Sequence, residues 1–98
     1  MGRLPLLRIH TETTPDGVTL RLEGKLIHPW VDELVRAWMG LGPGLLANPT
    51  VCIDLEAVSF VDAQGRSMLA ALRRLGCELK GRGPYISAVI EEASTDPT

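Results

Sequence analysis

The sequence has few of the residues from which metal and disulfide sites are built. Its 98 residues include only two cysteines and two histidines. Cys52 and Cys77 are not in a CxxC arrangement and no pair of histidines accompanies them, which argues against a zinc site. We therefore expect two free thiols, buried or half-buried in neighbouring strands, in a cytoplasmic and reducing compartment. No metal and no cofactor is predicted.

Long apolar runs and a strong charge of either sign are also lacking. No apolar run approaches the roughly 20 residues of a membrane-spanning helix, and the apolar part of residues 1–10 is too short for a secretory signal. The net charge of −2 gives no reason to expect binding to nucleic acid or to an anionic membrane. With 45% hydrophobic and 22% charged residues, the chain has the composition of one globular domain covering residues 1–98.

A catalytic constellation is missing as well. His10 lies in an expected strand and His28 just before an expected helix, and neither has a nucleophile close to it in sequence. Asp54 and Glu56 alternate onto one face of a strand, where pairing with Arg21 or Lys80 of the neighbouring strands is the simpler interpretation. We predict that the protein is not an enzyme.

Hydrophobic periodicity predicts strands and helices in the order ββαβαβα. Strands with alternating apolar residues are expected at residues 6–12, 18–23, 51–56 and 77–80. Helices with an apolar stripe are expected at residues 29–38, 66–75 and 84–90, followed by a polar tail from about residue 92.

This order indicates an α/β fold with a mixed four-stranded sheet. If the later strands are neighbours in sequence order, right-handed crossovers between them place both crossover helices on one face. The alternation agrees, because strands covered on both faces would be continuously apolar. We therefore predict helices mainly on one face and an open, polar opposite face. The edge at residues 77–80 would be unpaired and would invite a homodimer or a partner by strand addition.

The candidate functional unit is residues 51–75, which read as a strand, a turn at residues 62–65 and a helix; we expect the function to lie at the turn. Asp62 is a natural N-cap, because its carboxylate can accept from the free N–H groups of the next turn. Gly65 would let a backbone or a partner approach closely. The positive end of the helix also suits an anion or a carboxylate of a partner.

Two arginines of the same helix form a second candidate feature. Arg66 and Arg73 lie seven residues apart on its outer side. They form either a solvated helix face or a basic stripe that meets an acidic partner surface, where such charges mostly set association rate and partner choice.

The unit resembles the STAS domain, the family of bacterial anti-sigma-factor antagonists and of parts of some transporters. The resemblance rests on residues 53–55 (Ile-Asp-Leu), 58–62, Gly65 and 69–74, and on the LEGKL sequence of residues 22–26. It implies a single STAS-like domain, although this chain is short at the C-terminus, where such domains commonly carry a further strand and helix.

The sequence departs from the family at one functional position. In the phosphorylated members a serine directly follows the Asp, whereas here Ala63 and then Gln64 follow Asp62, and neither can accept a phosphate. Ser59 and Ser67 lie on the strand side and in the helix and are not simple replacements. The resemblance therefore implies a non-enzymatic regulatory module without the family's phosphorylation switch. Its candidate partner-binding residues are Asp62, Ala63, Gln64, Gly65, Arg66 and Arg73.

Three functions fit this resemblance. The first is an antagonist of an anti-sigma factor, whose partner is a kinase-like protein. The second is an accessory subunit that docks on the ABC ATPase of a lipid-transporting system. The third is a sensor of a small ligand, a nucleotide or a lipid, held near the turn.

Overall fold

The computed structural model describes residues 6–15, 17–41 and 50–94. In order, these form β1 (Leu7–Thr14), β2 (Gly17–Leu26), α1 (Val31–Met39), β3 (Thr50–Val61), α3 (Ala63–Arg74), β4 (Glu78–Lys80) and α4 (Pro84–Ser94). The predicted ββαβαβα order is confirmed.

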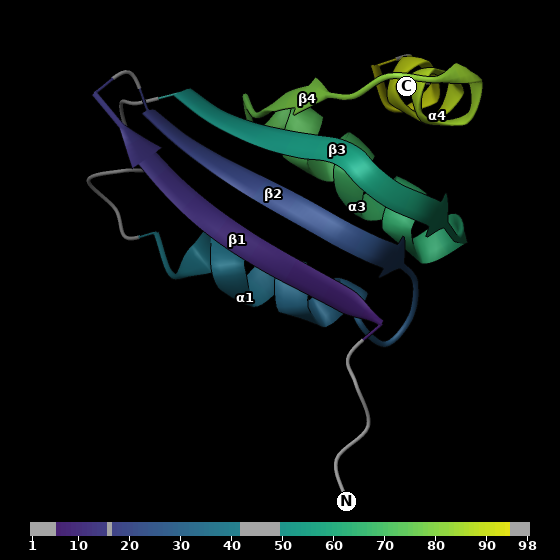
Figure 1. Cartoon of the computed structure of the whole chain (residues 1–98), viewed down its shortest axis with the longest axis horizontal. Helices are drawn as coiled ribbons and strands as arrows, with labels where there is room; N and C mark the ends of the chain where they lie inside the picture. Colours follow the sequence, from purple (N-terminus) through teal and green to yellow (C-terminus); the bar gives the residue numbers. More distant parts are fainter. Residues whose placement is uncertain (1–5, 16, 42–49, 95–98) are drawn as a thin grey trace, which may run out of the picture.

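The strands form one mixed sheet in the order β1-β2-β3-β4. β1 and β2 are antiparallel, while β2–β3 and β3–β4 are parallel. α1 and α3 lie behind the sheet on one face, and α4 packs against α3 (Figure 1). The core lies between the sheet and these helices, and its most deeply buried side chains are Leu20, Leu22, Leu26, Leu34, Ile53, Leu55, Val61, Leu69 and Leu72. The expected mixed sheet with helices on one face is therefore confirmed.

β3 continues to Val61, five residues beyond the end expected from alternation. Its register against β2 shifts twice. From Arg21 to Glu23 of β2, the facing residue of β3 advances by three positions, from Asp54 to Ala57. From Gly24 to Lys25 it advances by two positions, from Val58 to Phe60. Each shift is a β-bulge in which β3 holds one extra residue. The buried residues after Leu55 are consequently three positions apart, which breaks the period of two; they are Val58 and Val61. β2 likewise continues to Leu26 instead of ending at residue 23.

Side chains satisfy backbone groups at both bulges. At the first, the Asp54 carboxylate accepts a hydrogen bond from the N–H of Glu56 (3.0 Å). At the second, the Ser59 hydroxyl donates to the carbonyl oxygen of Gly24 (3.2 Å). Polar groups that a bulge removes from the ladder need such partners, so both side chains have structural roles.

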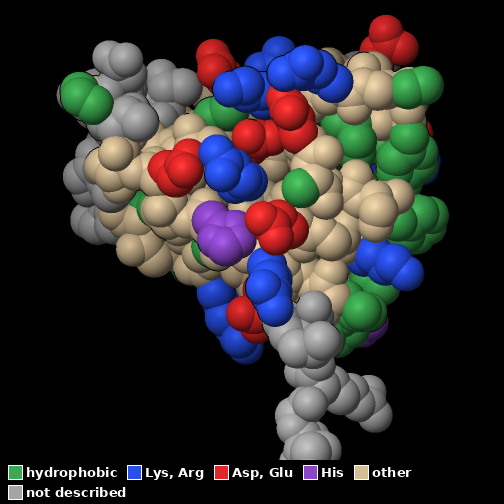
Figure 2. Space-filling model, in the orientation of Figure 1, with side chains coloured by type: hydrophobic (Ala, Val, Ile, Leu, Met, Phe, Trp, Pro, Cys, Tyr) green, Lys and Arg blue, Asp and Glu red, His purple; other side chains and the backbone are tan. Residues whose placement is uncertain are grey.

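The open face of the sheet is polar, as predicted, with basic and acidic side chains interspersed (Figure 2). Arg21 lies 3.2 Å from Glu12 and 3.8 Å from Asp54, which confirms the expected cross-strand pairing of Asp54. Glu56 instead pairs with Arg82, at 3.4 Å, in the segment after β4. Arg82 lies outside the strands predicted from the sequence, so its pairing with Glu56 was not expected.

The two cysteines are free. Cys52 is half-buried in β3, and Cys77 is buried directly before β4. Burial raises the pKa of both thiols, which lowers the fraction of reactive thiolate at neutral pH.

The first turn of α4 closes the end of β3 that β4 leaves uncovered. β4 pairs only with residues 52–54 of β3. Farther along, the Tyr85 hydroxyl accepts from the N–H of Val61 (2.9 Å) and donates to its carbonyl oxygen (3.2 Å). The Phe60 and Tyr85 rings stack at 6.2 Å between centroids and 9° between planes. Tyr85 thus takes the place of a neighbouring strand at this point.

We expect Tyr85→Phe to lower the free energy of unfolding by about 1 kcal/mol, since Val61 loses a donor and an acceptor while the ring stack is kept. Urea unfolding measures the difference. Ser87→Ala, on the exposed side of the same helix, is the control and should change stability by less than about 0.5 kcal/mol. Equal losses in both variants would contradict the structural role of the hydroxyl.

The last helix is longer than expected. Helix α4 continues to Ser94, beyond the end expected at residue 90, and its Glu92 carboxylate lies 3.2 Å from the guanidinium of Arg66. A contact between two helices therefore stabilises a segment whose sequence alone is polar.

Candidate partner-binding site

Asp62 connects three segments at the end of β3. As the N-cap of α3, its carboxylate accepts from the N–H of Gly65 (2.8 Å). The same carboxylate accepts from the N–H of His28 (2.9 Å), and the Asp62 N–H donates to the Leu26 carbonyl oxygen (3.2 Å). The hydrogen bonds from His28 and Gly65 lower the pKa of Asp62. The predicted N-cap is confirmed. The hydrogen bond from His28, in the segment between β2 and α1, was not predicted from the sequence.

The expected anion site at this helix end is largely occupied by the chain's own Asp62 carboxylate. The backbone N–H groups of both Gly65 and Gln64 are directed at the Asp62 carboxylate. A carboxylate of the chain itself therefore already lies where an external anion would bind.

Gly65 is buried and faces the chain's own backbone. A Cβ at this position would overlap the carbonyl oxygen of Leu26 and lie 2.8 Å from Cγ1 of Val61. The close approach predicted for Gly65 is thus made by β2 and β3, which lets α3 begin directly against the sheet.

Ala63 and Gln64 are exposed in the first turn of α3. Helix α3 begins at Ala63, so the expected turn at residues 62–65 is the N-cap and first turn of the helix. Ser67 is also exposed, one turn farther along.

Arg66 and Arg73 are directed toward α4. The Arg66 guanidinium lies 3.2 Å from the Glu92 carboxylate, and Nε of Arg73 donates to the Ser94 hydroxyl (3.3 Å). These two arginines therefore form internal contacts between α3 and α4. Only a weak signal in the sequence indicates these contacts, namely an acidic and a hydroxyl residue close together in the last helix.

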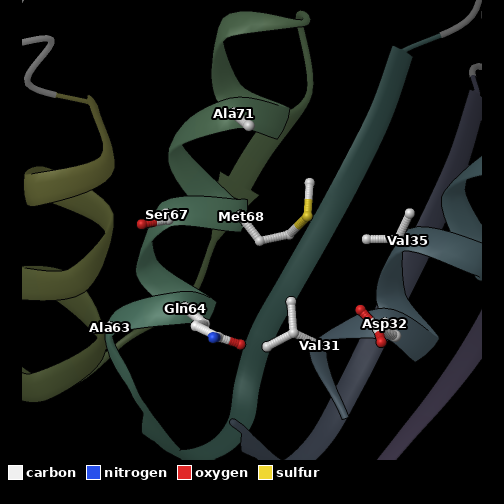
Figure 3. A pocket seen from close by; sticks show the side chains of 8 residues that line it. All are labelled: Val31, Asp32, Val35, Ala63, Gln64, Ser67, Met68 and Ala71. Atoms are coloured by element: carbon white, nitrogen blue, oxygen red, sulfur yellow. The ribbon is translucent and has the colours of Figure 1, made fainter. Parts of the chain in front are cut away.

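A groove of about 450 Å³ runs between α1 and α3. Met68 and Gln64 extend from α3 toward α1, where Val31, Val35 and Asp32 form the other side (Figure 3). The lining is mainly apolar. Sequence reasoning missed the contribution of α1, because only the folded chain brings its first turns beside those of α3.

A second groove, of about 650 Å³, lies between α3 and α4. Its lining combines small side chains of α3 with charged ones, namely Ala63, Arg66, Ser67, Ala70, Arg74, Glu92 and Ala93. Ala63 and Ser67 line both grooves. Position 63 therefore lies where the two grooves meet.

Neither a cluster of metal-ligating side chains nor a membrane-spanning helix occurs among residues 6–15, 17–41 and 50–94. The His, Cys, Asp and Glu side chains of these ranges form no group of three that could hold a metal ion. None of the helices in these residues is long and apolar enough to cross a membrane.

Comparison with known proteins gives similarity in structure only. No protein-family model and no curated protein matches the sequence. An anti-sigma factor antagonist from Mycobacterium paratuberculosis is similar with a TM-score of 0.71 and 20% identity, over 94% of this chain and 86% of that chain. The STAS domain of an antisigma-factor antagonist from Rhodobacter sphaeroides is similar with a TM-score of 0.55 and 24% identity, over 91% and 92%.

A third structure, described as Mglu, is similar with a TM-score of 0.61 and 28% identity, over 76% of this chain but only 19% of that much longer one. The two antagonist structures identify the fold: the chain has a STAS-like fold. The resemblance noted from its sequence is thereby confirmed at the level of the fold.

Proposed function

We propose that this STAS-like domain is a non-enzymatic regulatory module of a bacterial cytoplasm that binds a protein partner, in the manner of an anti-sigma-factor antagonist. Its similarity to two structures described as such antagonists supports the proposal. The partner class is an anti-sigma factor of the kinase-like type. The observation that carries the proposal is the exposed first turn of α3, which lies between two grooves.

The partner surface comprises Ala63, Gln64 and the two grooves beside them. The small side chains of α3 let a partner approach the helix closely, and the apolar lining between α1 and α3 offers surface to bury. Asp62 and Gly65 contribute indirectly, because they fix the position at which α3 begins. Arg66 and Arg73 hold α4 against α3 and so shape the second groove.

The interface would remain in one charge state, because Ala63 offers no hydroxyl for phosphorylation. In a module with a serine at this position, a phosphoryl group would add a charge of about −2 beside the Asp62 carboxylate. Association through Ala63 would instead be constitutive.

We expect Ala63→Glu to weaken binding to the cognate anti-sigma factor by about tenfold or more, because a carboxylate would enter the contact beside Asp62 without a partner charge. Titration calorimetry with the purified pair measures the affinity. Ala63→Gln has nearly the same size without the charge and should bind more tightly than the Glu variant. Unchanged affinity with Ala63→Glu would show that this turn is not the contact.

The groove between α1 and α3 also favours the small-ligand alternative, with a lipid in preference to a nucleotide. Its lining is mainly apolar, and its one charged side chain, Asp32, would repel a phosphate. Thermal unfolding with lipids and with nucleotides, in the absence of a protein partner, distinguishes this function from the first.

A further inference from the structure

The two edge strands of the sheet differ in how well they are protected against pairing with another molecule. β4 has three residues, includes Lys80, and is followed by Tyr85, which closes the exposed end of β3. β1 has eight residues, contains neither proline nor lysine, and pairs with β2 in an unbroken register. Short strands, bulges, proline and charged side chains, above all lysine, are the usual protections against pairing between molecules. The β4 edge combines several of them, whereas β1 has only charged side chains, and these are of both signs.

The backbone groups on the free side of β1 follow from its pairing. The Lys25 N–H donates to the Leu6 carbonyl oxygen (2.8 Å), which sets the phase of the antiparallel ladder. Hydrogen-bonded pairs alternate along such a ladder. Arg8, His10 and Glu12 therefore bond toward β2, whereas the N–H and C=O groups of Ile9 and Thr11 point outward, with those of Leu7 and Thr13. No hydrogen bond joins these outward groups to other backbone of the described ranges outside the sheet.

The side chains of β1 on the open face carry charges of both signs. Arg8, His10 and Glu12 are exposed. His10 lies 3.4 Å from Glu23, and Glu12 lies 3.2 Å from Arg21. Arg8 makes no ion pair with another residue of the described ranges. An acid from another molecule is therefore the natural partner for Arg8 at this edge.

We propose that two copies of the chain associate through β1, antiparallel and centred on His10, so that the two sheets form one continuous sheet. In this register Ile9 bonds to Thr11 of the second copy and Leu7 to Thr13, each through outward backbone groups. Arg8 then faces Glu12 of the second copy, and the symmetry repeats this pair. Directly opposed opposite charges stabilise a strand pair, so the pattern of β1 is complementary to itself.

The charges also select among the registers that the outward groups allow. A pairing centred on Ile9 would place Arg8 opposite His10. One centred on Thr11 would place Glu12 opposite His10, a weaker partner for an acid than the permanently charged arginine, and would leave Arg8 without an acid. Both lose the two pairs between Arg8 and Glu12, which leaves the register centred on His10. The dimer does not depend on the proposed partner surface, because β1 and the first turn of α3 are separate parts of the fold.

Sedimentation equilibrium of the full chain, at concentrations from low micromolar to submillimolar, tests the dimer. We expect a dimer for the wild type and association weaker by about tenfold or more for Arg8→Glu and for Glu12→Arg, because each change opposes like charges twice. An equimolar mixture of the two variants should form a heterodimer, since one copy then carries two acids and the other two bases at the facing positions. Thermal unfolding establishes that each variant is folded.

Amide hydrogen exchange provides a readout of the register. The outward amides of Ile9 and Thr11 should be protected at high protein concentration and exchange rapidly at low concentration. The amides of Arg8 and His10, which bond to β2, should be protected at both. A wild type that stays monomeric over the whole range overturns the proposal. A dimer whose outward amides stay unprotected, or variants that fail to form a heterodimer, would overturn it as well.

Discussion

Gly65→Ala is expected to lower the free energy of unfolding by about 2 kcal/mol, although alanine favours a helix by about 1 kcal/mol over glycine. The added Cβ would overlap the Leu26 carbonyl oxygen and crowd Val61. The Leu26 carbonyl oxygen belongs to the backbone of an inner strand and accepts a hydrogen bond from the Asp62 N–H, so it cannot turn away as a flexible side chain could. Either α3 shifts outward from the sheet or the strand bends, and both changes loosen the core.

Urea unfolding of both proteins measures this loss. Ser67→Ala, an exposed position in the same helix, is the control and should change stability by no more than about 0.5 kcal/mol. A Gly65→Ala protein as stable as wild type, or more stable, would show that α3 is free to move away from β2.

The second large effect is expected for Asp62→Ala, which should lower the free energy of unfolding by about 1 to 2 kcal/mol at neutral pH. The substitution removes the acceptor for the N–H groups of both Gly65 and His28. It therefore affects the start of α3 and the segment leading into α1 together, and with them the groove between the two helices.

The contribution of Asp62 should also depend on pH. Hydrogen bonds from His28 and Gly65 lower the pKa of Asp62 in the folded protein, so folding favours the ionised carboxylate. Its stabilisation is fully present above the ordinary aspartate pKa of about 3.9 and is lost as the pH falls through the lower folded-state value. The stability difference between wild type and Asp62→Ala should therefore shrink as the pH is lowered below about 4.

Unfolding by urea between neutral and strongly acidic pH gives this difference at each step. Asp62→Asn keeps a side-chain acceptor but cannot ionise, so it should retain part of the stability without the acid dependence. Parallel stability curves for wild type and Asp62→Ala over the whole range would contradict the role of the ionised carboxylate.

The parts of the fold that were predictable from sequence are those with local causes. Asp62 is recognisable as a cap because capping needs only the next turn of backbone. Gly76 ends α3 with a positive φ, and Pro84 begins α4, and both signals lie within a few residues of the boundary they set. The predicted end of β3 was wrong because the strand contains bulges. These bulges depend on the pairing with β2, and the alternation of residues along one strand carries no information about that pairing.

The candidate site divides in the same way. Ala63 and Gln64 were candidates from sequence because they follow a recognisable cap at the start of a helix, and both are exposed. The contacts of Arg66 with α4 could not be read from α3 alone, since Glu92 lies 26 residues farther along the chain. The groove beside Ala63 depends on Val31 and Val35 of α1, which the sheet brings to α3 from an earlier crossover.

The two bulges of β3 have a consequence for how genes for such domains can change. Each extra residue after Leu55 returns the next apolar side chain to the core face, and the second brings Val61 opposite Leu26. Loss of a single codon in this segment would turn Val61 toward solvent and start α3 from the wrong side of the sheet. Exposed positions such as Glu56 and Ala57 should therefore accept many substitutions over evolutionary time, while selection removes in-frame deletions from the same few codons.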